Sequence, residues 1–232
     1  MGAAIGWGAL AASSLVIGAL LAFAVDLPKV VLGLVLAFGA GALISAVSFE
    51  LAEEGLDVGG IGWTALGLAA GGLAYFTLDG LIDRKFGNEG GTSLALGAFL
   101  DGIPEQLVLG IGIASGTGVS VGLLVAIFVS NLPESIGSAR EMKDSGDRSE
   151  GSIIKLWIGV AFVALLSSIA GYALGDGFTG EMHAVVDGFA AGALIVMLID
   201  SMIPDAREKA GRYAGLAAVL GFAVAVALSN VS

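Results

Sequence analysis

Apolar runs of about 20 residues alternate along the chain with short segments that carry charges, glycines and prolines. A helix of that length crosses a hydrocarbon core of roughly 30 Å, so each run is predicted to span a membrane. The predicted spans lie near residues 3–24, 30–51, 59–81, 91–115, 118–140, 153–175, 181–203 and 211–231. The pattern therefore predicts an all-α polytopic membrane protein of about eight transmembrane helices, with residues 1–232 as a single transmembrane domain.

The composition agrees with this prediction and excludes several classes of site. The chain is 56% hydrophobic and only 13% charged, which is unlike an ordinary soluble domain. It contains no cysteine, so disulfides, thiolate metal sites and cysteine nucleophiles are excluded. Nucleic acid is not an expected partner, because the net charge is −11 and no basic patch is available to neutralise phosphates.

The basic residues indicate how the helices are oriented. All ten lie in or beside the first, third, fifth and seventh connections: Lys29; Arg84 and Lys85; Arg140, Lys143, Arg148 and Lys155; Arg207, Lys209 and Arg212. Cytoplasmic loops collect Lys and Arg, so these connections are predicted to lie inside. Both termini are then expected outside, in an integral protein of the plasma or inner membrane.

Two stretches of the chain resemble each other. The stretch AFGAGALISAVSFELAEE, residues 37–54, aligns with GFAAGALIVMLIDSMIPD, residues 188–205, and the two lie on helices of opposite direction. This pattern favours an inverted repeat, in which helices 1–3 match helices 6–8 around central helices 4 and 5. The alternative is that small-residue patterns recur wherever transmembrane helices pack closely.

Acidic residues interrupt the fourth and fifth spans. In FLDGIPEQLVLG, residues 99–110, Asp101 and Glu105 are four residues apart and share one helical face. In FVSNLPESIGSA, residues 128–139, Asn131 and Glu134 are three residues apart. A charge at the bilayer centre costs about 2.5 to 3.5 kcal/mol on insertion scales, so such residues normally face a partner, an ion or a water-filled path.

If these two helices pack together, their polar groups meet near the midplane. The carboxylates would be joined by the amide of Asn131 and the hydroxyl of Ser130, with no basic residue at that depth. A bound cation is the simplest way to neutralise them, and shared protons are the competing explanation. Oxygen ligands suit Mg, Mn, Ca, Fe(II) and, less selectively, Zn. The single histidine, His183, lies at the outer start of the seventh span and is interpreted as a solvated side chain.

Acids nearer the helix ends have two interpretations. Glu50 and Glu54, at the outer end of the second span, could gather cations at an entrance through their local field, or form an ordinary hydrated helix end. Asp79 and Asp200, toward the inner ends of the third and seventh spans, could line an exit, or simply be hydrated or paired with nearby basic residues.

These motifs resemble those of the ZIP (Zrt- and Irt-like) divalent metal transporters. That family has a His-Asn-x-Pro-Glu-Gly type motif in its fourth helix and a His-Glu-x-Pro-Glu-Gly type motif in its fifth. The corresponding residues here are Asp101-Gly102-Ile103-Pro104-Glu105-Gln106 and Ser130-Asn131-Leu132-Pro133-Glu134-Ser135. The glycine-rich second helix and SMIPDA in the seventh extend the similarity over essentially the whole chain.

The resemblance implies an eight-helix transporter, often a homodimer, that moves Zn, Mn, Fe or related ions into the cytoplasm. Carried over by position, the metal site comprises Asp101, Glu105, Ser130, Asn131 and Glu134. Asp101 replaces the histidine ligand of the family and Gly102 replaces an asparagine, which favours a divergent, oxygen-rich site. The divalent metal is the transported substrate, and no organic cofactor is expected.

Two other functional classes are alternatives to metal transport. An intramembrane protease is disfavoured, because the Gly-x-Gly-Asp context of the aspartyl type is absent and the only histidine is too near the surface to activate a buried serine. The chain is therefore not expected to be an enzyme. The stronger alternative is a ZIP-fold protein that has lost metal transport and carries another solute or a proton-coupled substrate.

Overall fold

The computed structural model describes residues 1–86, 91–114, 120–146, 148–175 and 177–229. Within these residues the chain forms helices and no strand. In order they are α1 (Gly2–Ala24), α2 (Lys29–Ser45), the π-helical segment η1 (Ala46–Ala52), α3 (Glu53–Gly59), α4 (Ile61–Phe86), α5 (Gly91–Ala114), α6 (Val121–Asp144), α7 (Glu150–Gly175), α8 (Gly180–Met197), the π-helical segment η3 (Leu198–Met202), α9 (Ile203–Ala210) and α10 (Tyr213–Ser229).

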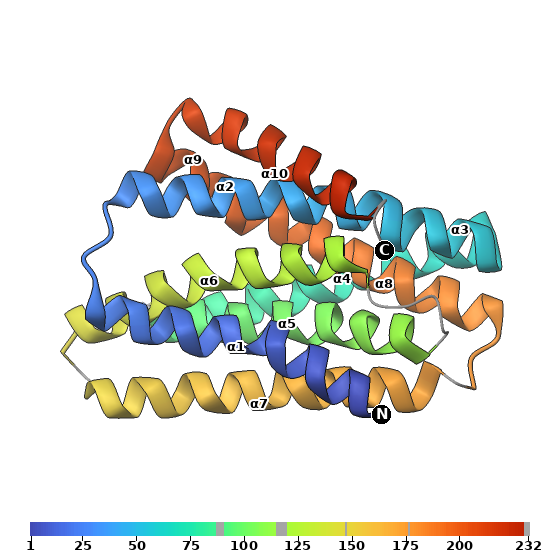
Figure 1. The fold of residues 1–232 in the computed structure, drawn as a ribbon, viewed down its shortest axis with the longest axis horizontal. Helices are drawn as coiled ribbons and strands as arrows, with labels where there is room; N and C mark the ends of the chain where they lie inside the picture. Colours follow the sequence, from blue (N-terminus) through green and yellow to red (C-terminus); the bar gives the residue numbers. More distant parts are fainter. Residues whose placement is uncertain (87–90, 115–119, 147, 176, 230–232) are drawn as a thin grey trace.

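The helices lie side by side along the long axis of the molecule (Figure 1). In the described residues, seven helical segments are long and apolar enough to cross a membrane, and α10 is a shorter apolar helix of 17 residues. The chain is an all-α polytopic membrane protein, as the hydrophobic pattern predicts.

Several helices extend beyond their predicted ends. Residues 53–60 and 204–212 were expected to be connections, but most of them form α3 and α9, which continue the second and seventh spans. Glutamate, lysine, arginine and alanine favour helix, so polar ends continue the helix after the apolar run stops. The turns come at Gly60 and Gly211, whose φ angles of 81° and 59° suit glycine best.

Both π-helical segments lie at matching positions of the two similar stretches of sequence. η1 is in the stretch 37–54 and η3 in the stretch 188–205, and each follows a long apolar helix. A π-helical turn accommodates an extra residue and turns the following side chains to a different face of the helix. The two similar stretches therefore share a local backbone irregularity as well as residues.

The helices pack in two groups. The first contains α1, α5, α6 and α7, and the second contains α2 to α4 and α8 to α10 with both π-helical segments. One hydrophobic core lies within the first group. A larger core joins the second group to α5 and α6. The surfaces of α5 and α6 that face the second group are therefore the seam between the two groups.

Glycines allow several helix pairs to approach until their backbones touch. A Cβ atom added to Gly41 of α2 or Gly221 of α10 would lie 1.9 Å from a carbonyl oxygen of the other helix. Gly110 of α5 and Gly171 of α7 make the same reciprocal contact at 2.0 Å, and Gly71 of α4 lies equally close to α8. Such crossings are typical of membrane helices, which associate through close packing of small residues.

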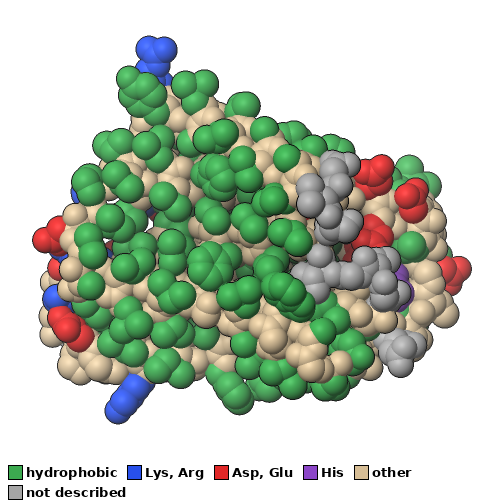
Figure 2. Space-filling view, viewed as in Figure 1, with side chains coloured by type: hydrophobic (Ala, Val, Ile, Leu, Met, Phe, Trp, Pro, Cys, Tyr) green, Lys and Arg blue, Asp and Glu red, His purple; other side chains and the backbone are tan. Residues whose placement is uncertain are grey.

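Charge is divided between the two ends of the bundle. Both termini and the α3 end lie together, and the α1–α2 and α6–α7 connections and α9 lie at the opposite end (Figure 1). On the face shown in Figure 2, Lys and Arg side chains lie only toward the second of these ends. We call this the basic end, and the end with the termini the acidic end. The ten basic residues follow the predicted alternation of connections.

A polar clamp at the basic end holds α1 against α6. Arg140 donates a hydrogen bond to the Ala22 carbonyl oxygen at 3.0 Å and a second one to the carboxylate of Asp26, with which it forms an ion pair. The hydrogen bond from Arg140 and its charge hold the pKa of the Asp26 carboxyl below the usual value of 3.8. The connection between α1 and α2 is thereby tied to the end of α6.

Asp26→Asn is expected to lower the melting temperature slightly at pH 7 and progressively less as the pH falls below about 3.8. Because the folded-state pKa is lowered, the ion pair stabilises the fold above the unfolded pKa. This contribution is lost as the pH falls from about 3.8 through the lower folded-state value. The pair is exposed, so the difference should also shrink in high salt. Thermal unfolding in detergent checks this, and a difference as large at pH 3 as at pH 7 would contradict it.

Candidate metal centre

Two glutamates lie near the middle of adjacent helices of the bundle. Glu105 is on α5 and Glu134 is on α6, each within about one turn of the centre of its helix. Pro104 and Pro133 precede them, and both helices continue through their prolines. Because proline has no N–H, the carbonyl about one turn earlier loses its usual donor. The carbonyls of Leu100 in α5 and Val129 in α6 are therefore left without their usual helical donor.

The helical faces that carry these residues point into the seam between the two helix groups. Glu105 is buried with 1% of its surface exposed, and Leu109, one turn further along α5, packs in the larger core. On α6, Ile127 packs in the same core, and Asn131 and Glu134 follow it at intervals of four and seven residues on that face. The glutamates thus lie where α5 and α6 meet the second group.

Ser130 and Asn131 add neutral polar groups to this part of α6. Both are buried with 1% exposed, and the Ser130 hydroxyl donates to the Ile127 carbonyl oxygen at 3.1 Å. Its oxygen keeps lone pairs for a cation. The amide nitrogen of Asn131 has no hydrogen-bond partner among the described residues. Turning this amide over would present its oxygen instead, so Asn131 can act as a ligand or as a donor to a bound anion or water.

The structure describes four of the five predicted midplane residues. Asp101 lies on α5, but its side chain is outside the described part of the structure. Among the side chains that are described, no three His, Cys, Asp or Glu residues lie close enough together to hold a metal ion. The described side chains therefore offer the buried carboxylate of Glu105 and the partly buried one of Glu134, together with an amide and a hydroxyl.

Gln106 is a buried polar residue to which the sequence motif assigned no role. Its side chain is fully buried, and Nε2 donates to the Gly8 carbonyl oxygen of α1 at 3.4 Å. On the neighbouring helix, the Ser168 hydroxyl donates to the Ala4 carbonyl oxygen at 3.3 Å. These two contacts fasten α1 to α5 and α7 behind the glutamates. The signal in the sequence was an uncharged polar residue directly after Glu105.

The predicted entrance residues lie at the acidic end. Glu50 is in η1, where its Oε1 accepts a hydrogen bond from the Ser229 hydroxyl at 2.6 Å. Glu54 is in α3 and is partly buried, so neither is simply a hydrated side chain beyond the end of a helix. His183 of α8 is also partly buried, with its ring edge against Phe178 at 5.4 Å between ring centroids. His183 is thus partly solvated and partly covered by Phe178.

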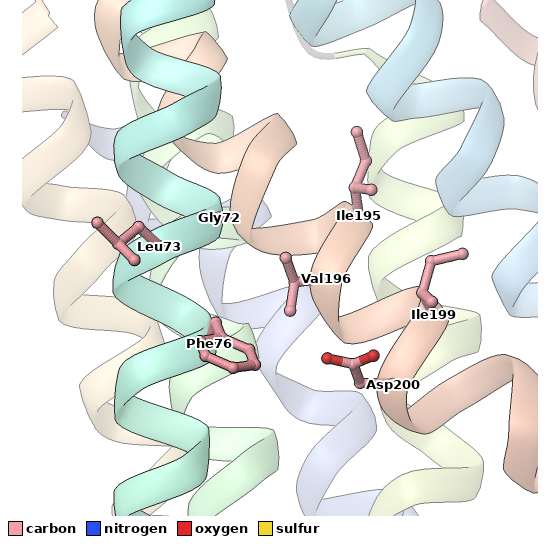
Figure 3. A pocket seen from close by; sticks show the side chains of 7 residues that line it. All are labelled: Gly72, Leu73, Phe76, Ile195, Val196, Ile199 and Asp200. Atoms are coloured by element: carbon pink, nitrogen blue, oxygen red, sulfur yellow. The ribbon is translucent and has the colours of Figure 1, made fainter.

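The predicted exit residues lie toward the basic end of the second group. Asp200 is exposed in η3 and lines an open groove of about 520 Å³ between α4 and α8, otherwise bordered by residues 72, 73, 76, 195, 196 and 199. Figure 3 shows its carboxylate directed toward Phe76 of α4. Asp79 is partly buried on α4. Asp200 thus faces the outer side of the α4–α8 pair.

Comparison with known proteins gives one informative similarity. No family model matches the chain. A protein of Arabidopsis thaliana named "Putative zinc transporter" is 28% identical to it over 229 residues. The alignment covers 93% of this chain and 36% of that protein, so the chain spans about a third of the relative's length.

Proposed function

We propose that this protein moves divalent metal cations, such as Zn, Mn or Fe, across the membrane through a midplane site. The site comprises Asp101, Glu105, Ser130, Asn131 and Glu134. The main support for the proposal is Glu105, a carboxylate with 1% exposure near the centre of a spanning helix. All ten basic residues of the chain belong to the odd-numbered connections. A carboxylate at this depth normally faces a partner, an ion or a water-filled path, and a passing cation would be such an ion.

We also propose that the chain is a ZIP-type transporter with an inverted repeat of helices 1–3 and 6–8. The paired Pro-Glu motifs of α5 and α6 support this assignment, as does the similarity to a protein named as a zinc transporter. The π-helical segments at matching positions of the two similar stretches support the repeat. Residues 1–232 then act as one transport domain, which we expect to form a homodimer.

The division of charge supports an orientation of the protein in the membrane, and the resemblance to the ZIP family suggests the direction of transport. We propose that the basic end faces the cytoplasm and that both termini lie outside the plasma or inner membrane, because cytoplasmic loops collect Lys and Arg. Cations would enter past Glu50 and Glu54 at the acidic end. They would leave toward the basic end, where Asp79 and Asp200 serve as weak ligands near the exit.

Metal selectivity is expected to depend on Asp101. A carboxylate at this position makes an all-oxygen donor set, which suits Mn, Fe(II) and Mg better than an imidazole site would. Asp101→His is therefore expected to raise the ratio of Zn uptake to Mn uptake. Competition between the two ions in proteoliposomes measures this ratio, and an unchanged ratio would remove Asp101 from the site.

The test of the proposed function is metal uptake into proteoliposomes that contain the purified full chain. Zn, Mn, Fe(II), Co, Cd and Mg are compared with protein-free vesicles, using a trapped metal-sensitive dye. Saturable uptake of at least one ion supports transport. If the folded protein moves none of them, the alternative is a carrier of another solute or of protons on the same scaffold, which a trapped pH dye then examines.

A further inference from the structure

A second group of ionisable side chains lies at the acidic end, where α3 packs against α8. The two helices approach closely because Gly59 of α3 has no side chain: a Cβ there would lie 2.4 Å from Cβ of Ala184. Gly55, one turn earlier, also faces Ala184, since a Cβ added there would lie 3.5 Å from the Ala184 Cα. Glu54, next to Gly55 in the sequence, is therefore brought level with the first two turns of α8.

Two residues of α8 face this contact. His183 and Asp187 are four residues apart, so they lie on the same side of the helix, one turn above the other. The helix is fixed at its start by Thr179, whose hydroxyl oxygen accepts a hydrogen bond from the Met182 amide at 3.4 Å. The ring of His183 is held against Phe178. The histidine and the aspartate are thus presented together toward α3.

Asp187 of α8 is a buried carboxylate that lacks a hydrogen bond within the described part of the chain. Only 4% of its surface is exposed, and it makes no hydrogen bond among the described residues. Glu54, a like charge, lies close enough to interact with Asp187, and Glu54 also interacts with His183 and Glu50. A buried carboxylate without hydrogen bonds and beside another carboxylate is unfavourable unless a cation or a proton joins it.

No Lys or Arg is available at this end to balance these charges. All ten Lys and Arg residues belong to the opposite end, and Glu50 adds a further carboxylate, of which Oε2 is buried without a hydrogen bond. Two carboxylates and an imidazole are a donor set used for Zn and for related divalent transition metals. The chemistry of the cluster therefore points to a metal ion rather than to an organic cation.

We propose that Glu54, His183 and Asp187 bind a divalent transition-metal ion at a site separate from the Glu105–Glu134 region. As they stand, the three side chains do not converge closely enough to hold an ion. Binding therefore requires Glu54 or His183, both only partly buried, to turn toward Asp187. Glu54 also belongs to the proposed entrance, but binding here does not require transport through the midplane, because none of the three residues lies there.

The test uses His183 as a reporter, since it is the only histidine in the chain. The full chain, labelled with ¹⁵N-histidine and purified in detergent, is titrated with Zn²⁺ while the imidazole resonances are followed. We expect a saturable shift in the wild type and the same shift in Glu105→Gln. Asp187→Asn is expected to weaken the apparent affinity at least about tenfold, since even outer partners of a metal site are worth that much.

Glu181→Gln is the matched control, because it removes an exposed carboxylate from the first turn of the same helix. Its affinity should equal that of the wild type. An imidazole signal that does not respond to Zn²⁺, or that responds equally in Asp187→Asn, would overturn the proposal. A shift that vanishes in Glu105→Gln would also overturn it, because the histidine would then be reporting occupancy of the midplane site.

Discussion

Glu105→Gln is expected to reduce metal uptake by proteoliposomes at least about a hundredfold, since a direct ligand should matter at least as much as the outer partners of a metal site. The substitution preserves side-chain size at a position with 1% exposure and removes only the negative charge. A neutral amide cannot offset the charge of a dehydrated cation. Glu134→Gln should have a similar effect, because it removes the other glutamate of the paired motifs.

Folding should survive these two changes. Glutamine matches glutamate in size and in helix-forming tendency, so the melting temperature in metal-free detergent should stay close to that of the wild type. Glu181→Gln, which removes an exposed carboxylate at the acidic end, provides a control with full uptake. Uptake that remained at the wild-type level in both glutamine variants would exclude the midplane site, whatever ion is transported.

Gly171→Ala is expected to have the largest effect on stability. The added methyl group would lie 2.0 Å from the Leu107 carbonyl oxygen, so α5 and α7 would have to separate along their contact. Forced repacking of this kind typically costs about 1 to 3 kcal/mol, and more when backbone must move. We expect a clear fall in melting temperature or loss of the monodisperse peak, measured by size-exclusion chromatography after heating.

Gly159→Ala tests whether the close contact between α5 and α7 causes the loss of stability. It makes the same change on the same helix, but a Cβ at this position has no atom within 4 Å. Alanine is the better helix former by about 1 kcal/mol in water, so this variant should be as stable as the wild type or more so. If both alanine variants lost stability equally, the cost would lie in the helix itself and not in its contact with α5.

The spanning helices and the alternation of charged connections could be predicted because both are properties of local sequence. An apolar run long enough to cross a bilayer must satisfy its backbone within itself, so its helical state needs no knowledge of neighbours. The helix ends could not be predicted in the same way. Residues 53–59 and 203–210 are polar enough for loops, yet each continues a helix that is already nucleated.

The two candidate sites also differ in how far the local sequence could identify them. Glu105 and Glu134 could be identified because each follows a proline within one apolar run. Asp187 also interrupts an apolar run, but its neighbour Glu54 comes from a segment that was expected to be a loop. Without α3, nothing in the sequence places Glu54 beside α8. The cluster therefore required the structure, although the spacing of His183 and Asp187 was visible in the sequence.

The separation of charge between the two ends also makes the protein's orientation directly measurable. Trypsin cuts after Lys and Arg, and all ten such residues belong to connections at the basic end. Trypsin added outside sealed vesicles would therefore cut only the molecules whose basic end faces outward. Trypsin added after the vesicles are dissolved in detergent would cut every molecule. The ratio of the two digests gives the fraction of molecules in each orientation in the same vesicles that are used for uptake.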